Sequence, residues 1–582
     1  MMVGRIARAL AGLLCLATVM EAQQIEYDLE QIEAGKPPQM GNAPDEGDPF
    51  YEAGRQVYFK RCYSCHGRYG EGDGMAAHYL DPRPRDFTFG MFKFRTTLSG
   101  ELPTDADLFR TVSRGVPGTA MPAWGEGTFV LPEIERWQAI HFLKSLSEDF
   151  ENEDLNPYEE DRILDVGTVP GTTAERIENG KRWFLDADKA GCVKCHGPSG
   201  RGNGEAAGSH SDDWGDLILP ADMTKPWRYK NGAAVEDIYR TLTLGLNGTP
   251  MPSFMDAIPD DDDRWDLAMY VVSLLEPAAT TDNVIDAEKT EGALPATVDD
   301  PAWDAAVSYD VITGGQVVLG PRWQNPSVDM VHMQALYNDD EVALLLTWND
   351  RFENATSASA PFDLNEPRNS STELEYGDEV VTANDRAYEW DEIEALGDLW
   401  NPADTYLQVA AARIRATTAQ LPDQLAIHFP VKLPPPGKAE RPYLFMGDPG
   451  HPVNGWVWVA GAEQAVDGNA KGPQSSYTAQ EGEVGPTATA VFEDGQWRLL
   501  LRRSLVGDKK KDTHFAPGRP IPFTLRVWDG ANGEAGLQSA MSSWYYLNLK
   551  ASTPSRAYVY GLLGLAITFA LQLILVRRIR RG

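Results

Sequence analysis

The spacing of apolar residues along the chain predicts two amphipathic helices, followed by a long region of short strands. Apolar side chains recur at helical intervals over residues 133–146 and again over residues 264–275, as in helices that bury one face. From about residue 298 to 550 the pattern changes to short β-like runs separated by turn residues, such as residues 343–348 and 523–528. The pattern therefore predicts helical domains followed by an all-β sandwich.

An apolar run near the start of the chain predicts a secretory signal peptide over residues 1–22. Arg5 and Arg8 precede the apolar residues 9–19, and Ala22 offers a small residue before the cut. The run is too short to cross a bilayer. A lipoprotein cleavage before Cys15 is the weaker alternative, because Leu14 is a poor small residue at that position.

A second apolar run, at the other end of the chain, predicts a transmembrane helix. Residues 557–576 carry no charge and are long enough to cross ~30 Å of hydrocarbon. Four arginines follow, at positions 577, 578, 580 and 581. The positive-inside rule puts these arginines in the cytoplasm. We therefore expect a single-pass protein of the cell membrane, with the bulk of the chain on the periplasmic side.

Four of the five cysteines form two Cys-x-x-Cys-His motifs, and the fifth, Cys15, lies in the predicted signal. This motif is the attachment signature of c-type haem: each thiol bonds one vinyl group, and the histidine is the proximal iron ligand. Zinc would need a second ligand pair nearby, and a redox thiol pair does not require the histidine. The motifs predict two covalent c haems, held by Cys62, Cys65 and His66 and by Cys192, Cys195 and His196.

An internal repeat adds a methionine to each haem motif. Residues 115–122 (Gly-Val-Pro-Gly-Thr-Ala-Met-Pro) match residues 245–252 (Gly-Leu-Asn-Gly-Thr-Pro-Met-Pro). Met121 and Met251 follow the first cysteine of their motif at the same spacing, so we interpret them as the distal iron ligands, with Met255 a weaker substitute in the second unit. Histidine and methionine together would fill both axial positions, which favours electron transfer over catalysis.

Residues 49–150 and 174–277 resemble class I cytochrome c. Each has an N-terminal helix leading into the Cys-x-x-Cys-His motif, a long loop, a methionine-bearing loop and a C-terminal helix. The resemblance implies two small all-α domains, each around one haem with an exposed edge. Residues 278–297 show no strong periodicity and are interpreted as a linker.

Short motifs in residues 298–550 resemble the haem-binding gamma subunit of ethylbenzene dehydrogenase and of related dimethylsulfide dehydrogenases. They include residues 300–303 (Asp-Pro-Ala-Trp), 348–350 (Trp-Asn-Asp) and 527–530 (Val-Trp-Asp-Gly). The resemblance implies a β-sandwich with one non-covalent b haem, ligated by Met and Lys, that relays electrons from a molybdenum enzyme of the dimethyl sulfoxide reductase superfamily. A haem-free docking sandwich is the alternative.

The ligands of such a b haem are left open by the sequence, because residues 536–544 have no lysine at the expected place. The polar and acidic residues 353–404 are interpreted as an insertion or a lid. The alternative ligands are Met330, Met333, Met446, Met541, His332, His428 and His451.

The charge of the chain narrows the choice of partners. With 86 acidic and 52 basic residues the net charge is −34, which argues against a nucleic-acid binder. Removing the predicted signal, of net charge +1, and the four C-terminal arginines takes this charge from −34 to −39 on the external part. That part should prefer cationic or neutral partners.

Together these features predict a membrane-anchored, periplasmic dihaem c-type cytochrome. It would transfer electrons as the haem subunit or partner of a molybdenum oxidoreductase, with a cytochrome or a quinone-linked acceptor, rather than catalyse a reaction itself. The enzyme alternative is a dihaem peroxidase, which needs an iron with an open site. The binding alternative is a carbohydrate- or ligand-binding sandwich with attached cytochromes.

Overall fold

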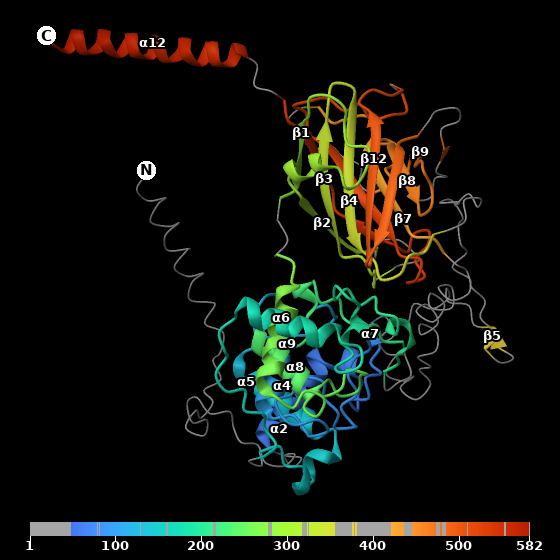
Figure 1. The fold of residues 1–582 in the computed structure, drawn as a ribbon. Coiled ribbons are helices and arrows are strands. Elements are labelled where there is room, and N and C mark those ends of the chain that lie inside the picture. Colours follow the sequence, from blue (N-terminus) through green and yellow to red (C-terminus); the bar gives the residue numbers. More distant parts are fainter. Residues whose placement is uncertain are drawn as a thin grey trace.

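The computed structural model has two helical units, a β domain and a separate C-terminal helix (Figure 1). The predicted signal peptide and most of the predicted insertion at 353–404 lie outside the described residues. The structure describes residues 48–580 except 78–79, 81, 129, 159–160, 213–216, 278–281, 317–322, 324, 356–374, 377–378, 381–420, 436–444, 473–477, 480–484, 509 and 552–554.

The first helical unit is built on the crossing of its first and last long helices. Its helices are α2 (Pro49–Arg61), α3 (Tyr63–His66), α4 (Asp105–Arg114) and α5 (Glu133–Lys144), with short turns η3 (Glu148–Glu151) and η4 (Glu153–Leu155). Helices α2 and α5 approach so closely at Gly54 that a Cβ there would lie 2.0 Å from the Gln138 carbonyl oxygen. Helix α5 confirms the helix expected over residues 133–146.

The second helical unit repeats this arrangement. Its helices are α6 (Ala174–Leu185), α7 (Cys192–His196), α8 (Val235–Leu244) and α9 (Asp261–Ser273), with turns η5 (Ala207–Ser209) and η6 (Pro226–Arg228). Gly180 of α6 crosses α9 where a Cβ would lie 2.0 Å from the Asp266 carbonyl oxygen. Helix α9 confirms the second predicted helix, and it begins earlier than expected because the side chain of Asp260 accepts the Asp262 amide and caps it.

The β domain is one continuous sheet that folds over into two layers. Thirteen strands are hydrogen-bonded, with β10-β9-β8-β7-β13-β14-β2-β3-β4-β12-β11 in order and β1 and β15 joined at the side. The strands are β1 (Val284–Lys289), β2 (Tyr309–Gly315), β3 (Met330–Tyr337), β4 (Glu341–Asn349), β7 (Gln424–Pro430), β8 (Val453–Val459), β9 (Val466–Ala470), β10 (Thr478–Ala479), β11 (Thr487–Glu493), β12 (Gln496–Ser504), β13 (Ile521–Trp528), β14 (Ala540–Ser542) and β15 (Tyr545–Leu549). The structure also has turn η7 (Pro301–Ala305) and a separate pair, β5 (Glu375–Tyr376) and β6 (Glu379–Val380).

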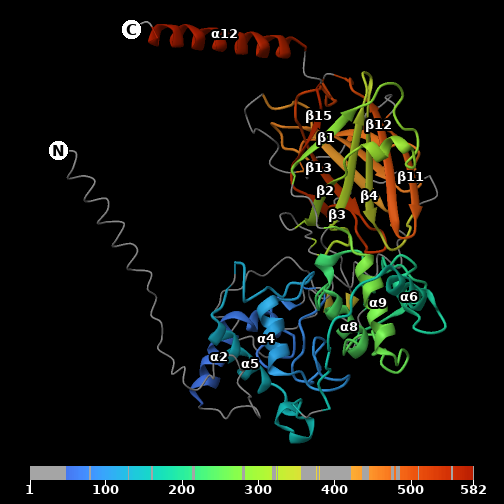
Figure 2. The same ribbon diagram turned by 60° about the vertical axis from the view of Figure 1, so that its left-hand side comes forward.

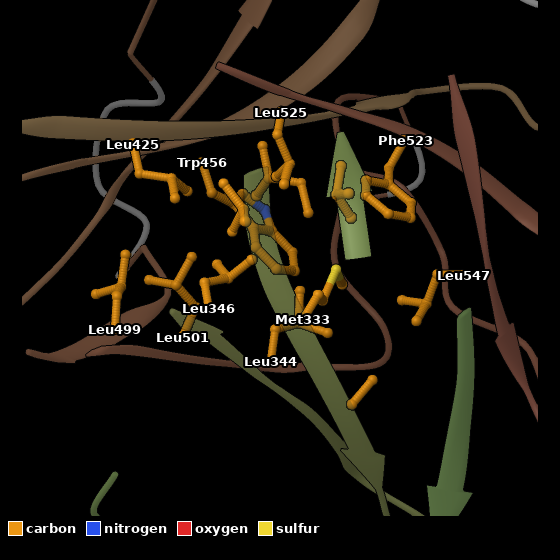
Figure 3. Packing of buried hydrophobic residues seen from close by; sticks show 14 of the residues in the cluster. Met333, Leu344, Leu346, Leu425, Trp456, Leu499, Leu501, Phe523, Leu525 and Leu547 are labelled. Atoms are coloured by element: carbon orange, nitrogen blue, oxygen red, sulfur yellow. The ribbon is translucent and has the colours of Figure 1, made fainter. Parts of the chain in front are cut away.

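The core of the β domain lies between its two layers. Figure 3 shows side chains of β3, β4 and β12 facing those of β7, β8 and β13, with Met333 and Trp456 among them. Strand β4 is buried on its other side as well, where Ala343 and Leu345 pack against a second cluster around Trp303. Burial on both faces explains why residues 343–348 are almost uniformly apolar.

The interpretation of residues 278–297 as a linker is corrected by strand β1. It pairs in parallel with β15, from Val284 opposite Tyr546 onward, and with β3 at Glu288 and Lys289. Ile285 and Ala287 are fully buried in the core, whereas the residues between and beside them are more exposed. Two inward side chains in a charged stretch are too weak a period-2 signal to indicate a strand from sequence.

Helix α12 (Ser555–Ile579) stands apart from the rest of the molecule (Figure 1). Within it, Val559–Ile579 has a mean hydropathy of 2.2 and no residue buried, and it is the single candidate membrane span in the part of the chain that the structure describes. Arg577 and Arg578 lie in its last turn. The helix predicted over 557–576 is therefore present and is long and apolar enough to cross a bilayer.

Candidate haem sites

Each Cys-x-x-Cys-His motif forms one helical turn after the first helix of its unit, immediately in the first unit and after a short loop, residues 186–191, in the second. In the first unit, the amides of Cys65 and His66 both donate to the Cys62 carbonyl, at 3.1 and 2.9 Å. Gly67 ends this turn with a φ of +79°, and a Cβ there would lie within 3.0 Å of the Asp73 side chain, so this position requires glycine. The second motif has the same turn as α7, ended by Gly197 with a φ of +73°.

Both predicted proximal histidines are half-buried and held in one tautomer. The Nδ1 atom of His66 lies 3.0 Å from the Arg85 carbonyl oxygen, and that of His196 lies 3.0 Å from the Ala221 carbonyl oxygen. A carbonyl only accepts, so Nδ1 must carry the proton, and Nε2 keeps the lone pair that a metal needs. Burial lowers the pKa of both imidazoles to about 4, so both are neutral at pH 7.

An aspartate that the sequence analysis missed supports each of these carbonyl-bearing loops. The Oδ1 atom of Asp86 accepts the amide and the hydroxyl of Thr88, at 2.8 and 2.6 Å. Asp222 does the same for Thr224, at 3.0 and 2.7 Å. In the sequence these aspartates belong to an Asp-x-Thr motif that occurs once in each unit. The spacing of this motif differs from that of the other repeated motifs, because the loop between it and the Cys-x-x-Cys-His motif is longer in the second unit.

The two methionine loops have the same hydrogen bonds. The Thr119 hydroxyl donates to the Val116 carbonyl at 2.8 Å and accepts the Met121 amide at 3.2 Å. Thr249 makes the equivalent bonds, at 2.8 and 3.2 Å, around Met251. This explains why threonine precedes each methionine by two positions. Met255, the weaker substitute, is exposed.

The structure brings the four predicted residues of the second set together around one cavity. Cys192, Cys195, His196 and Met251 all line a space of about 950 Å³. This volume is at the upper end of the range for cofactor pockets, ~300–1,000 Å³. All four motif cysteines are free thiols, as attachment of a haem to each pair requires. The residues present therefore fit a haem, and no other sulfur or metal-binding residue is needed to hold it.

The cavity is closed on one side by the β domain, through contacts that surround Asp329. The Asp329 carboxylate accepts Lys225 Nζ at 2.7 Å, Trp227 Nε1 at 2.8 Å and Arg228 Nε at 2.7 Å. Although burial opposes ionisation, these two cations hold the pKa of Asp329 well below its usual range. Asp329 and the residues that it binds all line the cavity.

Two residues at the end of β4 contact the loop that orients His196. The Asn349 amide donates to Asp222 Oδ2 at 2.9 Å, and Arg351 Nη2 donates to the Pro220 carbonyl at 3.3 Å. Figure 2 shows the second helical unit directly against the strand ends of the β domain. The β domain thus supports the proximal side of the second site.

The alternative ligands for a b haem differ in their burial and in their hydrogen-bond partners. Met333 is fully buried between the two layers, and Met330 is almost fully buried in β3. His332 lies 2.7 Å from Asp310, and His451 lies 3.0 Å from Asp448, so both are engaged by carboxylates.

His428 differs from these two histidines of the β domain. It is 1% exposed, and neither ring nitrogen has a hydrogen-bond partner. Burial, and next the charge of Arg526, lower its pKa to about 3. Arg526 Nη1 lies 3.8 Å from the sulfur of Met446, and Met446 and Met541 belong to one apolar cluster on this side of the sheet.

Both helical units match families of known proteins. Residues 177–275 match the cytochrome c family, and residues 49–143 match the family of the cbb3-type cytochrome c oxidase subunit III. A chain of the Kuenenia stuttgartiensis reducing HAO-like protein complex is 44% identical, covering 39% of this chain and 96% of that one, with a TM-score of 0.35.

Two curated relatives match parts of the chain. The putative respiratory nitrate reductase heme subunit of Haloferax mediterranei is 29% identical over 151 residues, which are 25% of this chain and 52% of the relative. The chlorate reductase subunit gamma of Ideonella dechloratans is 33% identical over 138 residues, which are 24% of this chain and 54% of the relative. The chain thus spans about half the length of the curated relatives it matches.

Proposed function

We propose that this chain, whose helical units are cytochrome c domains, is a dihaem electron-transfer subunit of a respiratory oxidoreductase complex. When bound, haem c supplies one-electron oxidation and reduction at its iron. The observation that carries the proposal is the repeated set of a Cys-x-x-Cys-His turn, a histidine oriented by a loop carbonyl, and a methionine in a matched loop.

In this proposal each residue of the two sets has one role. The cysteines would attach the haems, His66 and His196 would be the proximal ligands, and Met121 and Met251 the distal ligands. With a histidine and a methionine on each iron, neither iron would be open to a substrate, which argues against the dihaem peroxidase. The surrounding loops fix the tautomer of each histidine.

The contacts of the two sites suggest an order for electron transfer. The second site lies against the β domain, through Asp329 and Arg351. The first unit is joined to the second by Arg95, whose Nη2 donates to the Leu244 carbonyl at 3.0 Å. We therefore place the second haem next to a partner at the β domain, and the first haem next to the other redox partner.

The setting of this electron transfer follows from the relatives and from the motifs of the β domain. Two relatives are named as a heme subunit of a nitrate reductase and as the gamma subunit of a chlorate reductase. The resemblance of the β domain to the ethylbenzene dehydrogenase gamma subunit implies a molybdenum enzyme as the partner. Helix α12 would anchor the complex, with its terminal arginines in the cytoplasm and the haem units in the periplasm.

A b haem in the β domain is a second candidate feature. The buried His428 and Met446, which lies 3.8 Å from the Arg526 guanidinium, would supply an imidazole and a thioether without a lysine. Ligation by these two residues would differ from the Met and Lys that the resemblance implies.

Haem counting and methionine substitution test the proposal. Pyridine haemochrome analysis should give two c haems per chain, plus one b haem if the β domain holds one. Met121→Ala and Met251→Ala should each abolish the methionine–iron charge-transfer band of one haem. That haem should stay covalently attached, because the bonds between the cysteine sulfurs and the haem are unchanged. Met255→Ala is the matched control and should leave both bands.

Two outcomes would contradict the proposal. One is a pair of bands that survives both methionine substitutions, which would refute the assigned ligands. The other is a high-spin ferric c haem in the resting protein, which would indicate an open iron and favour the peroxidase.

A further inference from the structure

Three aspartates meet at the end of the β domain that faces the second helical unit. Asp350 follows β4, Asp423 precedes β7, and Asp529 follows β13. They are 4%, 0% and 4% exposed, and one carboxylate oxygen from each lies within 4.8 Å of the others. Because β4 belongs to one layer of the sandwich and β7 and β13 to the other, the cluster joins the two layers.

Most of the oxygen atoms in this cluster are fixed by donors from the surrounding chain. Asp423 Oδ1 accepts the backbone amide of Gly530 at 2.9 Å. Asp423 Oδ2 accepts the backbone amide of Asn354 at 2.7 Å and Trp497 Nε1 at 3.1 Å. Asp529 Oδ1 accepts the Asn532 amide at 3.1 Å. The carboxylates are therefore held in position before any ligand arrives.

One buried oxygen atom of the cluster has no donor among the residues that the structure describes. Asp350 accepts the backbone amide of Phe352 at 3.2 Å through Oδ1, but its Oδ2 is buried and has no hydrogen-bond partner in this part of the chain. The side-chain oxygen of Asn354, next to the cluster, is also buried and unpartnered. An unpaired buried carboxylate oxygen is costly, and such an atom marks a position for an ion or a proton.

The charges around the cluster bear on whether an ion or a proton occupies this position. Three carboxylates that are at most 4% exposed lie together. The fourth acid nearby, Glu534, is already satisfied by Trp323, Ser327, Asn532 and the Asp529 amide. The adjacent cation, Arg351, uses Nη2 to bind the Pro220 carbonyl on the helical side. A cation among the three aspartates would neutralise them where no side chain of the described residues does so fully.

We propose that Asp350, Asp423 and Asp529 bind a divalent cation, Ca²⁺, with the Asn354 amide oxygen as a further ligand. Oxygen ligands alone select a hard cation over zinc or copper. Ca²⁺ suits a dry site better than Mg²⁺, which keeps several waters.

The bound cation would order the segment that reaches the second haem site. Asn349 and Arg351, on either side of Asp350, contact the loop that presents the Ala221 carbonyl to His196. Loss of the cation should therefore disturb the second haem and leave the first unchanged. Cation binding itself does not depend on the proposed electron-transfer function.

Metal analysis and terbium luminescence of the full chain in detergent test the site. The purified protein should contain about one Ca²⁺ per chain, which a chelator removes. Tb³⁺ should then give luminescence sensitised by Trp497, whose indole contacts Asp423, and Ca²⁺ should quench it by displacement. Asp350→Asn, of equal size, should weaken Tb³⁺ binding about tenfold or more. Glu463→Gln, an exposed acid of the same domain, is the matched control.

Thermal unfolding separates lost binding from misfolding. Ca²⁺ should raise the unfolding temperature of the chelator-treated wild type and of Glu463→Gln, but not that of Asp350→Asn. If Asp350→Asn does not fold, Asp529→Asn replaces it. The proposal is overturned if the wild type shows neither bound metal nor sensitised luminescence. It is also overturned if Asp350→Asn is more stable than the metal-free wild type while the wild type does not respond to Ca²⁺, since shared protons would then explain the cluster.

Discussion

At the scale of single residues, the two candidate haem sites have a nearby arginine that comes from different parts of the chain. In the first site, Arg85 supplies both the carbonyl that orients His66 and a positive charge near that imidazole. In the second site, the carbonyl comes from Ala221, which has no charge, and the nearby guanidinium is that of Arg351 from the β domain. The β domain therefore supplies the positive charge near the imidazole of the second site.

This difference predicts a selective change in reduction potential. Arg351→Gln should lower the potential of the second haem by on the order of 50 mV, because a nearby positive charge favours the reduced, less positive iron. Arg85→Gln should do the same for the first haem only. Arg498→Gln, a surface residue paired with Asp299, should change neither potential. Spectroelectrochemical titration measures both haems, and an equal shift in both would contradict the assignment.

The proposed ligand residues stand out in the sequence, whereas the residues that support them do not. Cysteine, histidine and methionine stand in short motifs that repeat in one register, so local spacing was sufficient. Arg351 and Pro220 lie in different domains, and only the folded chain brings them together. Asp350 was part of a motif used for family resemblance, and nothing in the sequence placed it beside Asp423 and Asp529.

At the scale of secondary-structure elements, the close crossing of α6 and α9 positions the second haem motif. Helix α6 leads into the Cys-x-x-Cys-His turn, and its Gly180 lets the α9 backbone approach. Asn179 of α6 also donates to Asp263 and Asp266 of α9, at 2.8 and 2.9 Å. The orientation of α7 depends on this crossing.

A methyl group at this crossing should destabilise the second unit. Gly180→Ala puts a Cβ within van der Waals overlap of the Asp266 carbonyl and should cost about 1–3 kcal/mol. The effect is measured as the temperature at which the methionine–iron band of each haem disappears on heating. This temperature should fall for the second haem and stay constant for the first. Gly171→Ala, where no atom lies within 4 Å of the new Cβ, should change neither. An unchanged second band in Gly180→Ala would contradict the predicted role of the crossing.

Helices and long strands could be predicted because their periodicity extends over many residues. The predicted helices became α5 and α9, and the apolar runs became strands such as β4 and β13. Strand β1 was missed because its order depends on pairing with β15, from the opposite end of the β-domain sequence, rather than on its own composition.

At the scale of the whole molecule, a histidine links the second helical unit to the β domain. His332 of β3 lies 3.7 Å from Glu276, just after α9, and 2.7 Å from Asp310 of β2. Burial opposes its protonation, but hydrogen bonds to the two carboxylates prevail and raise the pKa of His332. This contact is therefore strongest when the imidazole is charged.

Because the pKa of His332 is raised, we predict that the contact between the second helical unit and the β domain is more stable in mild acid. The contribution of His332 is fully present below the unfolded-state pKa of ~6.5 and is lost as pH rises through the higher folded-state value. Hydrogen exchange in residues 274–277, corrected for intrinsic rates, should show about 0.5–1 kcal/mol less protection at pH 8 than at pH 6. His332→Gln should abolish this difference, whereas His451→Gln, whose partner is Asp448, should keep it. The same pH dependence in both variants would contradict the role of His332.

The point at which α12 is attached bears on the distance between the candidate haem sites and a bilayer in the proposed membrane-anchored arrangement. The Tyr337 hydroxyl, at the end of β3, contacts the Lys550 carbonyl just before α12, whereas the opposite end of β4 contacts the second helical unit. The nine residues of β4 span about 30 Å at ~3.3 Å per residue. In the membrane-anchored arrangement that we propose, the length of the β domain would separate the second haem from the point where α12 is attached. Electron tunnelling rates fall exponentially with distance, so we expect an intermediate carrier, rather than direct exchange, between this haem and a quinone in the bilayer.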